Sequence, residues 1–252
     1  MSYNAPVGCC RQRRFRAVCN AFWEMERDMK KAVFAFAALA AVAGSALASF
    51  SEGFEGASPG WAVTNASNPI GVNTAGWNSI PNATVWAAHS GVGQALANFN
   101  ATSEVGTISA WLFSPVDTIQ NGDTLKFWTR TGAGSIYPDR MQVRLSTNGA
   151  STNIGANEFS VGDFSTLLLD INPTLSGGGY PEGWTQFSIT ISGLGGPVSG
   201  RFAFRYFVED GGPLGNNSNI IGLDDVEFTS IPAPGALALA GLLGLTAGRR
   251  RR

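Results

Sequence analysis

An alternation of apolar and polar side chains runs through the middle of the chain and constrains its fold more than any other feature. Between Phe50 and Phe228 it recurs in short runs, such as Leu125–Arg130, Met141–Leu145 and Phe187–Ile191. A period of two residues is that of a β-strand with one face buried and the other in water. Groups of Gly, Pro and Asn separate the runs and are typical of turns. We therefore predict an all-β domain, a two-sheet antiparallel jelly-roll β-sandwich of about ten short strands, with the outer face of each sheet exposed.

The same pattern gives three local expectations. Val85–His89 is predicted to be a strand, and Asp163–Leu169 is predicted to form one short turn of helix. Along 201–209, apolar side chains alternate with charged ones, which predicts that the charged ones lie in water. No stretch of the chain repeats another, and this excludes a propeller or a solenoid.

The central domain is acidic and lacks cysteine. Between Ser49 and Ile231 it has six Lys or Arg and fifteen Asp or Glu, so its net charge is near −9, although the whole chain carries −1. This balance argues against nucleic acid as a partner, because phosphates need a basic face. All three cysteines precede Met29, so the domain contains neither a disulfide framework nor a thiolate metal site.

A signal peptide is predicted in front of the domain, at residues 29–48. Two lysines precede an apolar stretch at 32–43. Ala46 and Ala48 then stand at the spacing that signal peptidase cleaves, which makes Ser49 the first mature residue. The apolar stretch is too short for an ordinary membrane span, which needs about 20 residues, so we predict a signal helix that is removed on export.

Residues 1–28 do not fit a signal peptide. They are rich in arginine and contain Cys9, Cys10 and Cys19. We interpret them as a start-site artefact, with translation beginning at Met29 or, alternatively, at Met25. An extended export leader and a cytosolic cysteine cluster are the alternatives, and no chemistry is assigned to the cysteines.

The β-sandwich is expected to span 49–230 and to be followed by a sorting or anchor segment at 231–252. The 18 residues from 231 to 248 are uncharged. As a helix they would span about 27 Å, slightly less than a hydrocarbon core of about 30 Å. Basic residues after such a helix stay in the cytoplasm. We therefore predict a C-terminal apolar helix that is a marginal, temporary anchor; the alternative is an apolar terminus that packs on the domain. The basic end consists of Arg249, Arg250, Arg251 and Arg252.

The domain offers little for catalysis. Its single histidine, His89, would have to serve any Ser–His–Asp triad, and it lies in a segment flanked by Gly and Ser. We interpret it as a surface or loop residue. One histidine also excludes a multi-histidine zinc site. We therefore expect no enzyme, and a divergent glycan hydrolase that uses two carboxylates is the least favoured alternative.

Carboxylates at the two ends of the domain are candidates for a structural Ca²⁺ site, although no cofactor is required. Glu52 and Glu55 lie near its start, Asp224 and Asp225 near its end, and the terminal strands of a jelly roll are usually neighbours. Adjacent residues of a strand point to opposite faces, so one aspartate would be buried and would need a partner. Ca²⁺ prefers such oxygen ligands. The alternatives are a pair with an arginine such as Arg205 and hydrogen bonds from backbone N–H groups.

Six tryptophans lie in the domain, and the face of a tryptophan can pack on a sugar ring. Trp128 falls on the polar side of its strand, and Trp77 lies in an irregular stretch rich in Gly, Asn and Pro. These two are our candidates for ligand binding. The alternative for most of the tryptophans is packing in the core.

Short motifs along the domain resemble those of a known family. Phe50–Gly56 and Gly60-Trp61 open the domain, Leu125–Trp128 and Tyr137–Val143 lie in its middle, and Ile221–Val226 closes it. In this order they resemble choice-of-anchor J domains, bacterial jelly-roll modules similar to cleaved-adhesin and MAM domains. The resemblance implies a jelly roll, and related modules often hold a structural ion near the terminal strands.

The tail resembles the PEP-CTERM sorting signals of Gram-negative, exopolysaccharide-producing bacteria. Those signals combine a Pro-Glu-Pro-like motif, an apolar helix and terminal arginines. Here the motif is Pro232, Ala233 and Pro234, with alanine in the place of glutamate. The resemblance implies processing by exosortase, a membrane protease, or by a variant that reads Pro-Ala-Pro.

Together these features predict an exported, non-enzymatic cell-surface or extracellular-matrix protein with an adhesion or structural role. It would reside in the cell envelope or outside the cell, held transiently in the membrane by its tail. The expected partners are signal peptidase, an exosortase-like protease, the membrane and exopolysaccharide. The alternative is a carbohydrate-binding module that recognises exopolysaccharide through exposed tryptophans.

Overall fold

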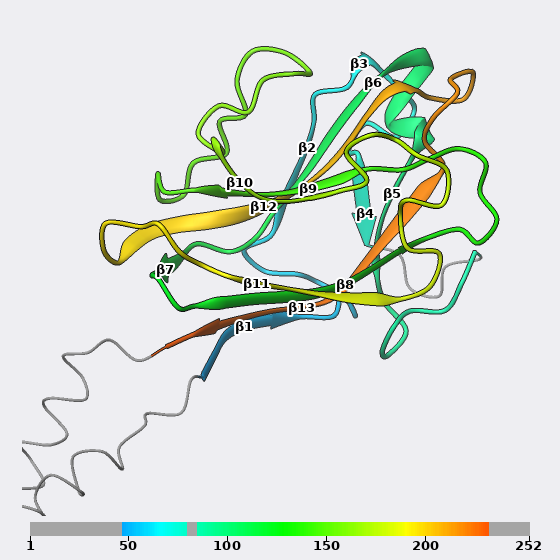
Figure 1. Cartoon of the computed structure of the whole chain (residues 1–252). Coiled ribbons are helices and arrows are strands. Elements are labelled where there is room, and N and C mark those ends of the chain that lie inside the picture. The colour runs from blue at the N-terminus through cyan, green and yellow to red at the C-terminus, as the bar shows by residue number, and fades with distance from the viewer. Residues whose placement is uncertain (1–46, 80–84, 232–252) are drawn as a thin grey trace, which may run out of the picture. The chain divides into compact units, whose positions relative to one another are not determined.

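The computed structural model describes residues 47–79 and 85–231. In this part of the chain two antiparallel sheets pack face to face (Figure 1). Helical structure among these residues is limited to one 3₁₀ turn, η1 (Phe99–Ala101). The prediction of an all-β, two-sheet antiparallel sandwich is confirmed.

Sheet A forms the lower layer in Figure 1, and all its strand pairs are antiparallel. In spatial order its strands are β11 (Thr185–Thr190), β8 (Thr124–Thr131), β13 (Ile220–Ser230), β5 (Ala95–Asn98) and β4 (Trp77–Ser79), and β1 (Leu47–Glu52) also pairs with β13. The first and last strands of the domain are therefore neighbours. Phe50 lies opposite Phe228, and Glu52 lies opposite Val226.

Sheet B forms the upper layer and is also antiparallel throughout. In spatial order its strands are β10 (Thr166–Ile171), β9 (Met141–Ser146), β12 (Val198–Gly211), β6 (Thr102–Phe113) and β2 (Ala62–Asn65), while β3 (Asn68–Ile70) also pairs with β6 and β7 (Asp117–Ile119) with β12. The sequence did not indicate β2, β3, β4 or β7, because strands of three or four residues are too short to show a period.

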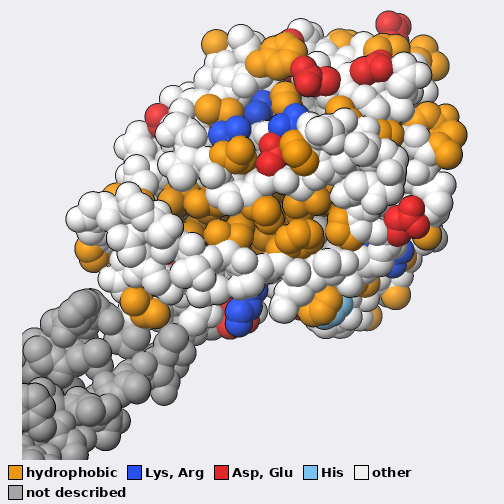
Figure 2. Space-filling view, viewed as in Figure 1, with side chains coloured by type: hydrophobic (Ala, Val, Ile, Leu, Met, Phe, Trp, Pro, Cys, Tyr) orange, Lys and Arg blue, Asp and Glu red, His pale blue; other side chains and the backbone are white. Residues whose placement is uncertain are grey.

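The core lies between the sheets and follows the predicted alternation. In β8, partly exposed and buried side chains alternate along all eight residues. Phe127 of this strand meets Phe204 of β12 edge-on, with ring centroids 5.2 Å apart. Hydrophobic side chains are visible between the two layers in Figure 2. The edge strands β10 and β11 contribute partly buried side chains to this core, namely Leu168, Leu169, Phe187 and Ile189.

The expectation that each sheet has an exposed outer face is wrong for sheet B. The loop at 147–165 covers part of this face, and its Phe164 packs on Trp111 of β6, with ring centroids 5.7 Å apart. Arg205 of β12, which was expected in water, is 1% exposed. Its guanidinium lies 4.7 Å from the ring of Trp111 and 3.9 Å from that of Phe207. The period of two could not reveal this, because the covering loop is irregular.

Two local predictions are also wrong. Val85–His89 is not a strand but an irregular segment that packs on the outer face of sheet A. Asp163–Leu169 is not helical, and its second half belongs to β10. In both places, contacts with distant residues outweigh the local preference.

The predicted cleavage point between Ala48 and Ser49 lies within β1. The backbone of Ala48 pairs with Thr229, and the pairing continues from Phe50 to Glu52. Cleavage there would remove two residues of β1 and leave the pairing of its remaining residues with β13.

The predicted segment 1–28, Ala46, the sorting motif and the terminal arginines lie outside the described residues. Within the described ranges, the structure contains no helix long and apolar enough to cross a membrane.

Candidate functional site

Four aromatic side chains gather on the outer face of sheet A, and we call them the aromatic cluster: Trp86, His89, Trp128 and Trp184. The two-residue period of β8 turns Trp128 away from the core. Trp184 immediately precedes β11, the neighbouring strand, while Trp86 and His89 belong to the irregular segment on this face. All four side chains are partly exposed. They come from three separate stretches of sequence, so the fold alone brings them together.

His89 and Trp128 form a stacked pair. Their ring centroids are 3.8 Å apart and their planes differ by 18°. Trp184 meets the same imidazole edge-on, at a centroid distance of 6.0 Å and an angle of 73°. The side chain of His89 is 27% exposed. Trp128, predicted as an isolated platform, is therefore one part of a composite aromatic surface.

Trp86 and Trp184 approach β13 at Gly222. A Cβ atom at this glycine would lie 2.9 Å from Cη2 of Trp184 and 3.2 Å from Cζ2 of Trp86. The Nε1–H of Trp86 donates to Oε1 of Gln94 at 2.7 Å, and the Nε1–H of Trp184 donates to the carbonyl of Ala87 at 3.0 Å. Both indoles are thus fixed by a hydrogen bond at one edge and by close packing on the strand.

The paired aspartates hold the segment that carries His89 against β13. Asp224 is buried and accepts hydrogen bonds from the backbone N–H groups of His89 at 2.8 Å and Ser90 at 3.3 Å. In Asp225, Oδ2 lies 2.6 Å from Nδ1 of His89, and Oδ1 accepts a hydrogen bond from Oγ of Ser90 at 2.7 Å. Both carboxylates therefore bind the same segment.

This arrangement corrects the expectation that the two aspartates point to opposite faces. Asp225 has a φ of +45°, in the left-handed region, and the register between β13 and β8 shifts between Asp224 and Glu227. Such a β-bulge redirects side chains locally. The rule that neighbours in a strand alternate between faces fails here, because the strand is irregular at this point.

The buried carboxyl of Asp224 is the most perturbed acid of this site. Burial raises the pKa of Asp224 from 3.8 to about 6. The neighbouring charge of Asp225 also raises this pKa, whereas hydrogen bonds from the backbone N–H groups of Asp225, Ser90 and His89 lower it. The carboxyl of Asp224 therefore changes its charge in mildly acidic solution.

The structure brings the two predicted glutamates to the same end of sheet A as the aspartates, because β1 pairs with β13. A Cβ atom at Gly53 would lie 3.5 Å from Oδ1 of Asp225 and 3.8 Å from Oε1 of Glu55. Glu52 accepts a hydrogen bond from the backbone N–H of Phe54 at 2.7 Å. Glu55 accepts hydrogen bonds from the backbone N–H groups of the segment that follows Gly91.

Each of these four carboxylates has a hydrogen-bond partner within the protein. Among residues 47–79 and 85–231, no three His, Cys, Asp or Glu side chains are grouped so that they could hold a metal ion. The Ca²⁺ site stays a prediction. Asp224 uses backbone N–H groups, which was the alternative prediction, and Arg205 lies on the other sheet.

Trp77, the second predicted ligand-binding residue, lies in the core. It is 2% exposed, and its Nε1–H donates to the carbonyl of Ala110 at 3.1 Å. Trp77 therefore does not present an exposed ring face on which a ligand could stack. The sequence also failed to point to Trp86, Trp184 and His89. Their only shared signal is aromaticity, and nothing in the local pattern indicates that they meet.

The residues around His89 do not form a hydrolytic triad. Ser90 and His89 both bind the carboxylate of Asp225, whereas a triad needs the serine hydroxyl on the histidine. Residues 56–60 match the Gly-x-Ser-x-Gly pattern of a nucleophile elbow, but they join β1 to β2 with no helix after them. Among the residues that the structure describes, no group forms a hydrogen bond with the hydroxyl of Ser58. The contacts of His89 and Ser90 are therefore not those of a Ser–His–Asp triad.

No family model and no curated protein matches the sequence. Among solved structures, the chain is similar to the K1 cleaved adhesin domain of Lys-gingipain from Porphyromonas gingivalis W83, with 21% identity and a TM-score of 0.48 over 73% of this chain and 98% of that one. It is also similar to TmCBM61 in complex with β-1,4-galactotriose, with 14% identity and a TM-score of 0.39 over 70% of this chain and 93% of that one. A third similar structure is the C-terminal family 22 carbohydrate-binding module of Clostridium thermocellum Xyn10B, with 10% identity and a TM-score of 0.41 over 74% and 96%. These neighbours are adhesin and carbohydrate-binding domains, and similarity at this level transfers no ligand and no residue role.

Proposed function

We propose that the chain is a non-catalytic adhesion domain that binds polysaccharide through the aromatic cluster. The observation that carries the proposal is the grouping of three partly exposed tryptophans and one histidine on a single sheet face. Aromatic rings combine an apolar face with polar edges, which suits the C–H faces and hydroxyl groups of a sugar ring. A cluster of such rings in water is otherwise unfavourable, because apolar surface is exposed.

The cluster is arranged in advance for binding. Trp86 and Trp184 are held by hydrogen bonds at their indole edges, and His89 is held by Asp225. Side chains that are already ordered lose less entropy when a ligand binds. The guanidinium of Arg130, 4.7 Å from the ring of Trp86, supplies hydrogen-bond donors next to the rings. The surface therefore offers both stacking and polar contacts.

The experiment is a binding titration of soluble xylan and β-1,4-galactan by affinity electrophoresis and calorimetry. Trp184→Ala and Trp128→Ala should each weaken binding by about tenfold or more, since a central aromatic contact contributes about 2 kcal/mol. The matched control is Phe159→Ala, which removes an aromatic side chain that is 53% exposed and lies outside the cluster. If no polysaccharide binds, or if the three variants behave alike, the proposal is wrong.

Export and sorting form the second part of the proposal. Signal peptidase would remove residues 29–48, and an exosortase-like protease would cut near Pro232 and Pro234 of the PEP-CTERM-like tail. The composition of the tail and its basic end support this part. Mass spectrometry of the protein from cell envelope and medium tests it, and an intact cytosolic chain that begins at Met1 would contradict it.

A further inference from the structure

Arg130 of β8 lies among the rings of the aromatic cluster. In the register of sheet A it is opposite Gly222, the residue on which Trp86 and Trp184 pack. It follows Trp128 by two residues, so both side chains point to the outer face of the strand. The guanidinium is 4.7 Å from the centroid of the Trp86 ring. A ligand that contacts these indoles would therefore lie beside a positive charge.

The guanidinium of Arg130 is held in place by the protein but keeps donors for a ligand. Its Nε–H donates to the carbonyl of Thr131 at 3.2 Å, and its Nη2 donates to the carbonyl of Glu182 at 2.6 Å. Its Nη1 forms no hydrogen bond with any residue that the structure describes. Water can reach this nitrogen, because the hydroxyl of Ser58 is the only buried side-chain N or O atom without a partner in the described ranges. The N–H groups of Nη1 are therefore available to a ligand.

The positive charge of Arg130 also lacks a counter-ion. Within residues 47–79 and 85–231, no carboxylate forms an ion pair with it. The two aspartates of the site bind other groups, since Asp224 accepts backbone N–H groups and Asp225 binds His89. Partial burial lowers the pKa of Arg130, because the charged form has lost part of its hydration. An anion bound here would compensate for that loss.

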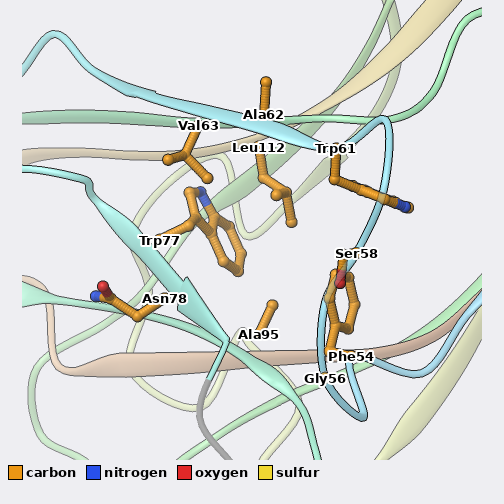
Figure 3. Close-up of a pocket in the computed structure, with 10 residues that line it drawn as sticks. All are labelled: Phe54, Gly56, Ser58, Trp61, Ala62, Val63, Trp77, Asn78, Ala95 and Leu112. Carbon is orange, nitrogen blue, oxygen red and sulfur yellow. The ribbon is translucent and has the colours of Figure 1, made fainter.

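The other aromatic surfaces in the described part of the chain do not combine rings with an available cation. Trp61 and Trp77 line a cavity of about 200 Å³ between the sheets, and no charged residue contributes to its wall (Figure 3). Three arginines lie over aromatic rings of sheet B, namely Arg140, Arg201 and Arg205. The first is paired with a carboxylate, and the other two are buried. Arg130 is therefore the candidate for binding an anionic ligand next to exposed rings.

These features favour one class of polysaccharide. A neutral sugar offers only hydroxyl groups to a guanidinium, whereas a carboxylate also neutralises its charge and forms hydrogen bonds that are about twice as strong. A uronic acid residue has such a carboxylate on a ring whose C–H face can pack on an indole. The domain as a whole is acidic, so general electrostatic attraction would not select an acidic polymer. A preference for one would have to come from a local cation.

We infer that the aromatic cluster recognises an acidic polysaccharide, in which Arg130 binds the carboxylate of a uronic acid residue whose ring contacts the tryptophans. The inference rests on the proposed function, because it names the class of polysaccharide for the same site. Arg130 is then the residue that determines specificity. The tryptophans supply contacts that charged and neutral sugars share.

The first test compares acidic polymers with their carboxyl-reduced forms, in which a CH₂OH group replaces each carboxylate. The two pairs are polygalacturonate and glucuronoxylan with their reduced products, titrated by calorimetry at an ionic strength of about 0.05 M to limit screening. We expect the acidic member of at least one pair to bind about fivefold or more tightly. Equal affinities within both pairs would overturn the inference and leave the proposed function standing. If none of the four polymers binds, the inference and the proposed function both fail.

The second test removes the charge of Arg130. Arg130→Gln should abolish the preference for the acidic polymer while changing the affinity for the reduced polymer much less. Arg130→Lys, which keeps the charge, should retain part of the preference. The matched control is Lys126→Gln, which removes a positive charge from the same face of β8 outside the aromatic cluster and should keep the preference. A preference that persists in R130Q, or that falls equally in R130Q and K126Q, would contradict the assignment.

Discussion

His89 lies parallel to Trp128 with ring centroids 3.8 Å apart, and its Nδ1 is 2.6 Å from Oδ2 of Asp225. One contact ties the imidazole to β8 and the other ties it to β13. An irregular segment is thereby fixed across two neighbouring strands without a strand of its own. The proposed binding surface is therefore positioned by tertiary contacts between side chains.

Replacement of Gly222 by alanine should displace the rings of Trp86 and Trp184, because a Cβ atom there lies within 3.2 Å of both. We expect a loss of about 1–3 kcal/mol in the free energy of unfolding and a change in tryptophan emission. Urea titration and fluorescence measure both effects. The control is Gly177→Ala, whose Cβ atom would meet nothing within 4 Å. A G222A variant that matches this control would show that the rings are not packed on β13.

Asp224 should make the stability of the domain depend on pH. Its folded pKa of about 6 exceeds the ordinary value of 3.8, so the folded state binds the proton more tightly than the unfolded state. The protonated carboxyl of Asp224 contributes fully to the free energy of unfolding below about pH 3.8, and this contribution is lost as the pH rises through about 6. Asp224→Asn should reduce this slope in urea titrations between these pH values, and the buried Asp139, whose pKa burial also raises, should supply a remaining slope of the same sign. His89→Gln, which leaves the backbone N–H groups on Asp224, should retain the full slope; an undiminished slope in D224N would contradict the assignment.

Tyr206→Phe should destabilise the core. Its hydroxyl donates to Oδ1 of the buried Asp139 at 2.5 Å, beside the donors Oγ1 of Thr131 and the backbone N–H of Asn219. Burial raises the pKa of Asp139, and the lost donor leaves its carboxylate underpaired. We expect the free energy of unfolding, measured by thermal or urea denaturation, to fall by about 1–3 kcal/mol. Tyr137→Phe, at a tyrosine that is 45% exposed, should change stability by much less.

Arg205→Lys should also destabilise the domain, although it preserves the charge. The guanidinium donates to Oγ of Ser109 and to the carbonyl of Glu158 and stacks on Trp111, whereas an ammonium group cannot make this planar set of contacts. We expect the free energy of unfolding to fall by about 1–3 kcal/mol, because the acceptors on Ser109 and Glu158 lose their donor. The same exchange at the partly exposed Arg130 is the control. Equal losses of stability at the two positions would mean that the buried contacts of Arg205 contribute little to the free energy of unfolding.

The strands that carry a clear period were predictable, and β8 is the best example. Its buried and partly exposed side chains alternate as expected, and this placed Trp128 on the outer face. Trp77 was misplaced because its stretch has no period from which a face could be assigned. Trp86, Trp184 and His89 were missed, since a site assembled from distant segments leaves no local pattern.

The sequence by itself determined a two-sheet β-sandwich, because a period of two residues is a direct consequence of strand geometry. Only the tertiary structure decided which faces meet water: the loop at 147–165 buries Arg205, and the segment with His89 packs on Trp128. It also decided that Asp224 and Asp225 bind one segment, through a bulge that breaks the period. The physical reason is that burial depends on contacts between residues far apart in the chain, whereas a period records only the relation of each residue to its neighbours.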